Sequence, residues 1–172
     1  MLRSLAKLEG YRILATDGEL GKARDFYFDD RYWTIRYLVA DTKKWLPGRL
    51  VLISPFTLME PDWFNDELPV NLTKQQIKDS PEVDEAKPVS RQKEAELVNY
   101  YGWPTYWAGV GNEYPGVIPV PDESRREREV KEAAGEDEND PHLRSTEEVL
   151  TYQIHAKDGE IGQVDDFIIE DN

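Results

Sequence analysis

A repeated segment is the feature of this sequence that most restricts how the chain can fold. Residues 143–172 repeat residues 2–31 without a gap, at a constant offset of 141, the difference between 143 and 2. Thirteen of the thirty aligned pairs are identical. A long internal period of this kind indicates that one structural unit occurs twice. We therefore expect residues 11–30 and 152–171 to have similar backbone shapes.

The repeated unit has the pattern of a strand, a tight turn and a second strand. Residues 11–16 alternate between an apolar and a more polar face, which is typical of a strand with one buried side. Asp17-Gly18 then predicts a hairpin turn, because glycine adopts positive φ without steric cost. In the returning strand the apolar spacing slips once, and a β-bulge near Asp25 would absorb the extra residue.

The remainder of residues 1–80 predicts a small, mainly β domain. Further strands are expected at Trp33–Asp41, Arg49–Ser54, Thr57–Glu60 and Glu67–Val70. The first of these is rich in β-formers and apolar on both faces, with Trp33 on the same face as Val39. A short helix capped at Asn71 or Thr73 should end near Lys78. Six short strands in about 70 residues favour a small six-strand barrel, closed or partly open.

Residues 81–142 read as a connecting region that is aromatic first and acidic later. Ser90 is expected to cap a short helix over Arg91–Tyr100. Five of the eight residues from Tyr100 to Trp107 are aromatic. The charge run after Asp122 has few apolar residues and predicts a solvated linker. The predicted organisation is therefore a barrel domain at 1–80, this linker, and a partial second repeat at 143–172.

Composition restricts the classes of partner and the cellular location. Thirty-five Asp and Glu residues against 21 Lys and Arg residues give a net charge of −14. Such a charge repels phosphate backbones, so no nucleic-acid partner is expected. The absence of cysteine excludes disulfides and thiolate metal sites. No apolar run approaches the length of about 20 residues that a transmembrane helix needs, and a cytoplasmic protein is expected.

Several motifs resemble one known family. The similarity lies in Gly10-Tyr11, Asp17-Gly18-Glu19-Leu20-Gly21, Asp25-Phe26-Tyr27-Phe28-Asp29, Ile35-Arg36-Tyr37-Leu38-Val39, Trp45-Leu46-Pro47-Gly48, Val51-Leu52-Ile53-Ser54-Pro55 and Tyr100-Tyr101-Gly102-Trp103-Pro104. These segments resemble the PRC-barrel domain, the β-barrel of the cytoplasmic part of the photosynthetic reaction centre H subunit, and its two-repeat bacterial members. The match covers residues 1–80, with 143–172 as an incomplete second copy.

The resemblance implies an assembly role rather than an enzymatic one. In the reaction centre the related barrel caps a membrane complex and supports electron transfer. This sequence lacks the transmembrane helix of that subunit, so we expect at most a peripheral association with a membrane complex. Fold alone does not settle function. The expectation is a non-enzymatic protein-interaction or assembly module, with electron-transfer complexes as one setting.

We identify no catalytic, cofactor-binding or metal site in the sequence. Paired carboxylates such as Asp29-Asp30 and Asp165-Asp166 could suggest a hydrolase, but pairs of this kind arise by coincidence in so acidic a chain. Glycines 18 and 21 form no phosphate loop, because neither opens a helix. A barrel that binds a small ligand is the alternative to a docking module, and a deep pocket lined by Trp33, Trp45 or Trp103 would favour it.

Aromatic residues are the candidates for protein docking, because Trp and Tyr anchor many interfaces. The candidate docking residues are Trp45, Tyr101, Trp103, Tyr106 and Trp107. The alternative role of the run Tyr100–Trp107 is a strap that lies across the barrel.

The second repeat contains only the strand–turn–strand part of the unit. An isolated hairpin is marginal in water, and its unpaired edges favour pairing with another chain. The hairpin is therefore expected to pack on the first barrel, to form a homodimer with a second copy, or to belong to a longer chain.

Overall fold

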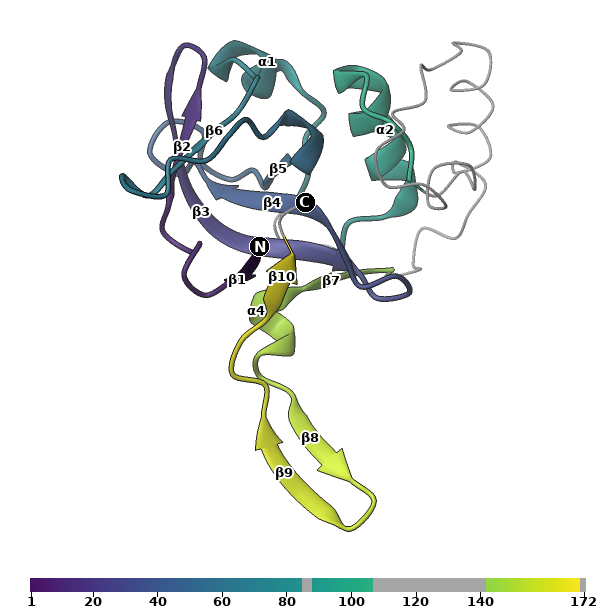
Figure 1. Cartoon of the computed structure of the whole chain (residues 1–172). Coiled ribbons are helices and arrows are strands. Elements are labelled where there is room, and N and C mark those ends of the chain that lie inside the picture. The colour runs from purple at the N-terminus through teal and green to yellow at the C-terminus, as the bar shows by residue number, and fades with distance from the viewer. Residues whose placement is uncertain (85–87, 107–141, 171–172) are drawn as a thin grey trace. The chain divides into compact units, whose positions relative to one another are not determined.

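The computed structural model describes residues 1–84, 88–106 and 142–170, and the chain forms two compact units (Figure 1). One unit consists of residues 1–78 together with 142–172, and the other comprises the residues between these two stretches. The first unit is mainly β, as predicted. The C-terminal repeat therefore shares a compact unit with the N-terminal one.

A β-sheet with the strand order β5-β4-β3-β2-β6 forms the centre of the first unit. Its strands are β2 (Arg12–Ala15), β3 (Gly18–Asp29), β4 (Thr34–Asp41), β5 (Val51–Ile53) and β6 (Glu67–Pro69). Neighbouring strands are antiparallel except for β6, which runs parallel to β2. No closed barrel is found in the part of the chain that the structure describes, so the six-strand barrel stays a prediction.

Strand β3 is the longest element and connects most of the sheet. It pairs with β2 near its start and with β4 along most of its length. At Tyr27–Asp29 it also pairs with β7 (Leu143–Ser145), which follows β2 along the same edge. A register shift between Ala23 and Asp25 leaves Arg24 as an extra residue, which confirms the bulge predicted near Asp25. Bulges bend a strand and increase its twist, so one strand can serve several partners.

Strand β4 is buried over four consecutive residues. Tyr37, Leu38, Val39 and Ala40 are all buried. Because successive side chains point to opposite faces, both faces of β4 are covered. The expected apolar pattern on both sides of this strand is therefore confirmed.

The turn between β3 and β4 differs from the prediction. Trp33 was expected to begin the strand, but its φ is 53° and its side chain is 70% exposed. Asp29 explains the difference, because its carboxylate accepts the backbone N–H groups of Arg31 and Tyr32, at 2.9 and 3.2 Å. These bonds fix a turn, and β4 begins only at Thr34. The indole of Trp33 stacks on Phe28 at a centroid distance of 5.4 Å.

The segment after β5 also differs in part. Residues Pro55–Thr57 form a 3-10 helix, η1, and of the strand expected from Thr57 to Glu60 only Leu58 pairs, in a single antiparallel bridge with Val70. Ser54 caps this helix and Pro55 supplies a pre-set φ at its first position, so the chain turns instead of extending. The helix α1 (Lys74–Asp79) follows with the predicted cap, since the Thr73 hydroxyl accepts the N–H of Gln76 at 3.0 Å.

Among the described residues of the second unit, Arg91–Tyr101 form the helix α2. Ser90 caps its N-terminus by accepting the N–H of Lys93, as predicted, and Gly102 ends it with a φ of 71°. Leu97, Val98 and Trp103 are buried. The expected acidic run from Asp122 to Asp140 lies outside the described residues. None of the helices in the described ranges is long and apolar enough to cross a membrane.

The C-terminal segment contains the helix α4 (Thr146–Val149) and three strands, β8 (Gln153–Ala156), β9 (Gly159–Gln163) and β10 (Ile168–Glu170). The β8–β9 hairpin matches β2–β3 in register. His155 pairs with Glu160 as Leu14 pairs with Glu19, and both hairpins shift register one residue before this pair. Figure 1 shows the hairpin extending away from the sheet.

The two repeats exchange their first strands. Strand β1 (Leu2–Ser4) pairs with β10 of the C-terminal repeat, in the register Leu2↔Glu170. Its counterpart β7 pairs with β3 of the N-terminal repeat, in the register Leu143↔Asp29. The two registers are identical after the offset of 141. Each repeat therefore lends a strand to the other.

We predict that Gly21→Ala destabilises the protein more than the matched variant Gly162→Ala. Both glycines have φ values that disfavour a side chain, +155° and +141°. A Cβ at Gly21 would also lie 2.0 Å from the carbonyl oxygen of Asp41, whereas a Cβ at Gly162 would meet nothing within 4 Å. Urea denaturation should show a loss above about 2 kcal/mol for Gly21→Ala and about 1 kcal/mol for Gly162→Ala. Equal losses would contradict the close approach of β4 at Gly21.

Candidate functional site

A buried carboxylate joins the N-terminal repeat to the C-terminal segment. Asp25 is 4% exposed and accepts four hydrogen bonds. The Ser145 and Thr146 hydroxyls donate to it at 2.6 and 2.8 Å, and the Glu147 N–H donates at 3.0 Å. The Phe26 N–H adds a bond of 2.7 Å. Asp25 therefore holds the first turn of α4 against the bulge of β3.

The C-terminal repeat has a similar arrangement at Asp166, without the hydroxyl donor of Thr146, because Leu5 is at that position. This carboxylate accepts the N–H groups of Ala6 at 3.0 Å and Phe167 at 2.8 Å. The pKa of Asp166 is lowered from 3.8, mainly by the hydrogen bond from the Ser4 hydroxyl. Burial has a smaller opposing effect than Ser4, and the two N–H groups add to the lowering. We call Asp25 and Asp166, with the donors of the opposite repeat, the two clasps. They anchor both ends of the C-terminal segment.

The two clasps lie close enough to act on one further carboxyl group. Partial desolvation, and then the negative charges of Asp25, Glu147 and Asp166, raise the pKa of Glu9. This acidic surrounding follows from the strand exchange, which brings the four groups together from both ends of the sequence. The raised pKa means that ionised Glu9 is disfavoured in the folded state and lowers stability, whereas ionised Asp166 raises it.

Beyond the clasps, the C-terminal repeat presents apolar side chains to solvent. Ile154 is 38% exposed and Ile161 is 69% exposed. Their counterparts in the N-terminal repeat, Ile13 and Leu20, are 0% and 1% exposed. Similar residues on the same backbone thus have opposite environments in the two repeats. The first repeat shows that this hairpin is compatible with complete burial.

The backbone edge of the same segment is also open. In the first repeat, residues 22–29 of β3 pair with β4. The corresponding residues are 163–170, at the end of β9 and along β10. In the described part of the chain β9 pairs only with β8, and β10 pairs only with β1. We define residues 152–170, with this edge and with Ile154, Ile161 and Ile168, as the open repeat face.

Trp45, a predicted docking residue, serves the first repeat as a strap. Its indole Nε1–H donates to the carbonyl oxygen of Leu20 at 2.6 Å. The Lys74 ammonium lies 4.7 Å from the ring centroid. Trp45 is therefore half-buried across the hairpin whose counterpart is uncovered in the C-terminal repeat.

The other predicted docking residues belong to the second unit. Trp103 is 5% exposed, and its ring stacks on Tyr101 at a centroid distance of 4.2 Å. Tyr106 is half-buried and donates its hydroxyl to Glu94 at 2.6 Å. Trp107 lies outside the described residues. Trp103 is therefore buried and leaves little of its indole for a partner.

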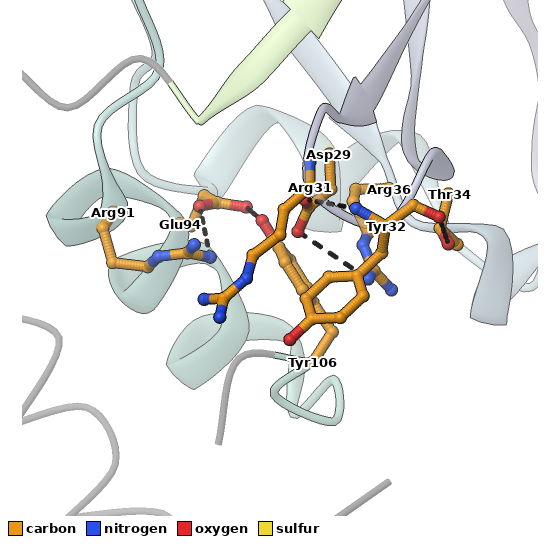
Figure 2. Close-up of polar contacts among 8 residues, drawn as sticks. All are labelled: Asp29, Arg31, Tyr32, Thr34, Arg36, Arg91, Glu94 and Tyr106. Atoms are coloured by element: carbon orange, nitrogen blue, oxygen red, sulfur yellow. Dashed lines mark hydrogen bonds and ion pairs between the residues drawn. The ribbon is translucent and has the colours of Figure 1, made fainter. Parts of the chain in front are cut away.

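Figure 2 shows two charged groups, one in each unit. In the second unit the carboxylate of Glu94, 0% exposed, accepts from Arg91 at 3.1 Å and from Tyr106. In the first unit Asp29 caps the turn after β3 and lies 3.8 Å from the guanidinium of Arg36. Each carboxylate is bonded to donors of its own unit. Both groups thus support local folding.

Sequence reasoning identified the hairpin but not the residues that make its exposed surface. The signal was present in the repeat alignment, where Ile154 lies opposite Ile13 and Ile161 opposite Leu20. Aromatic content pointed instead to the segment around Trp103, whose indole is buried. The sequence of the second repeat keeps these apolar positions but has no counterpart of the strand that follows them in the first repeat. A comparison on this point would have indicated the open repeat face.

The first clasp should contribute more to stability than the second. Asp25→Ala leaves buried hydroxyl and N–H donors without an acceptor, and we expect a loss of roughly 3 kcal/mol in the free energy of unfolding. Asp166→Ala should cost less, because that side chain is only half-buried and its donors can reach water. Urea denaturation of the two variants measures the difference. A larger loss for Asp166→Ala would contradict this ranking.

The lowered pKa of Asp166 predicts a pH-dependent contribution to stability. The ionised form is favoured in the folded state, so the contribution is complete above the unfolded pKa of 3.8 and is lost as pH falls through the lowered folded pKa. Ser4→Ala should raise the pKa toward 3.8, while Ser4→Thr keeps the hydroxyl and should preserve the low value. Carboxyl NMR titration measures this group separately from Glu9. An unchanged Asp166 titration in Ser4→Ala would disprove the assignment.

Comparison with known proteins leaves the function to be argued from the site itself. No protein-family model matches this chain, and no curated protein is significantly similar to it.

Proposed function

We propose that this protein is a non-enzymatic protein-interaction module that acts in the assembly of a complex and docks through its open repeat face. One observation carries the proposal. Ile161 is 69% exposed where its counterpart Leu20 is 1% exposed, on a hairpin of the same register. An exposed apolar surface next to unpaired backbone groups is typical of a protein-binding site.

The attachment of this face also suits a docking role. The clasps and the exchanged strands fix α4 and β10 to the main sheet. The β8–β9 hairpin between them is joined only to itself among the described strands. A partner would thus meet a hairpin held at both ends, so little conformational entropy is lost when it binds.

The proposed family is the PRC-barrel domain, and the resemblance lies in turns and core positions. Asp25, in the motif Asp25-Phe26-Tyr27-Phe28-Asp29, holds a clasp, and Asp29 caps the following turn. By analogy, the protein would support a larger complex, as the related barrel of the reaction centre H subunit does. A cytoplasmic location, and electron-transfer complexes as the setting, belong to this proposal and rest on the resemblance.

Two other functions were considered from the sequence, and neither has a specific observation in its favour. For a small-ligand site, the ring of Trp33 lies in solvent and the indole N–H of Trp45 is already bonded. For a hydrolase, the carboxylates of Asp25 and Asp166 are bonded to donors of this chain, and Asp30 is paired with Arg144 at 2.8 Å. These contacts favour structural roles for all three carboxylates.

The docking role predicts a selective effect of charge on the hairpin. Ile161→Asp places a carboxylate on the open repeat face, and a partner that buries this position must desolvate it. We expect at least a tenfold loss of binding to a stoichiometric partner purified from native lysate. Folding should be unchanged, because the Ile161 side chain lies largely in solvent.

Phe64→Asp is the matched control for this experiment. Phe64 is 94% exposed on a turn outside the open repeat face, so this variant also replaces an exposed apolar side chain with a polar one. It should retain the partner. Equal losses in both variants, or no stoichiometric partner of the unmodified protein, would contradict the proposal.

A further inference from the structure

We infer that the open repeat face accepts a β-strand with the sequence pattern of β4, supplied by a partner polypeptide and added antiparallel to residues 163–170. This inference rests on the proposed docking function and names the partner's chemistry. The N-terminal repeat provides the template, because it shows the same hairpin with its edge occupied. Each position of the open repeat face has its occupied counterpart 141 residues earlier in the chain.

The backbone edge of the open repeat face corresponds, position by position, to an edge that is occupied, although β9 ends at Gln163 and β10 begins at Ile168 where β3 is unbroken. In the N-terminal repeat, β4 pairs with β3 from Lys22↔Asp41 to Asp29↔Thr34, across the bulge at Arg24. At the end of this run β3 also pairs with β7, so residues 27–29 have a strand on each side. Strand β10 has β1 in the position of β7, with an identical register. What β10 lacks, among the described strands, is the counterpart of β4.

Space for the added strand is present at its closest point of approach. At Gly21 the Asp41 carbonyl oxygen lies so near that a Cβ atom at this glycine would be only 2.0 Å from it. The counterpart Gly162 also has a backbone φ that favours glycine, +141°, and no atom lies within 4 Å of its Cβ direction. A strand could therefore pass as close to Gly162 as β4 passes to Gly21.

The side chains along this edge match a buried environment better than an exposed one. Phe26 and Phe28, on the strand that pairs with β4, are 5% and 4% exposed, whereas their counterparts Phe167 and Ile169 remain partly exposed. Ile168 is 63% exposed. Burial of apolar surface of this kind contributes roughly 25 cal/mol for each Å² removed from water. Pairing with an apolar strand such as β4 would bury apolar surface along the whole edge and so stabilise the complex.

A partner polypeptide fits this edge better than a second copy of the chain. The β4 strand of a second copy is paired on both sides, with β3 and with β5. It could be donated only by dismantling that copy's own sheet. Two copies could instead pair through their β9 strands. In that arrangement β10 would still have no neighbour in the position that β4 has beside β3. The proposed partner therefore carries an unpaired β4-like segment.

The probe for this inference is a synthetic peptide with the sequence of residues 31–55, which includes β4, β5 and Trp45. It is added to the isotope-labelled full chain, and NMR records amide exchange along residues 163–170. We expect saturable binding with slowed exchange at alternate amides of this edge. A peptide with Val39→Pro is the matched control, because proline removes a ladder donor from the centre of the strand. It should bind at least tenfold more weakly, as should the normal peptide to the Ile161→Asp protein.

Three outcomes would overturn the inference. The first is the absence of saturable binding, and the second is protection only at residues 22–29, which would mean that the peptide displaces the protein's own β4. The third is self-association through β9, detected by sedimentation equilibrium and abolished by Ile161→Asp. If the peptide fails while Ile161→Asp still loses the native partner, the docking function stands and only the strand-addition mode is wrong.

Discussion

The structure of the first unit depends on the reciprocal clasps that join residues near the two ends of the sequence. Asp25 binds the turn that follows β7, and Asp166 binds the turn that follows β1. A short strand of three residues has too few backbone bonds to be stable alone. The carboxylates add charge-assisted hydrogen bonds at the point where each strand ends, and these bonds are among the stronger ones in proteins. Exchange of strands and exchange of clasps thus support each other.

Within each short repeat, the ends of the unit and the hairpin between them have different roles. The ends of the unit, β1 or β7 and the last part of the second strand, fasten the repeats together. The hairpin between these ends is free to meet other elements. In the N-terminal repeat it is covered by β4, β6 and Trp45. In the C-terminal repeat the described elements leave it uncovered, and this difference gives the molecule its candidate interaction surface.

Much of the local structure could be predicted from the sequence, because it depends on short-range chemistry. The bulge near Asp25, the caps at Thr73 and Ser90, and the burial of β4 all follow from nearby residues. The turn at Trp33 could not be predicted in this way, since the Asp29 carboxylate overrides the β propensity of the tryptophan. The strand exchange was beyond local reasoning altogether. It joins strands from opposite ends of the chain, and no spacing rule indicates which repeat an edge strand will join.

The pairing of β7 with β3 has a consequence for the order of synthesis. Tyr27–Asp29 receive their second neighbour only when residues 143–145 become available. Such a connection has a high contact order, and loop closure over this distance slows folding. While the chain is still emerging from the ribosome, the last part of β3 has one bare edge and the buried carboxylate of Asp25 has not met its donors. The N-terminal half therefore completes its native contacts only after residues 143–147 have been synthesised, and until then a chaperone has an exposed strand edge to protect.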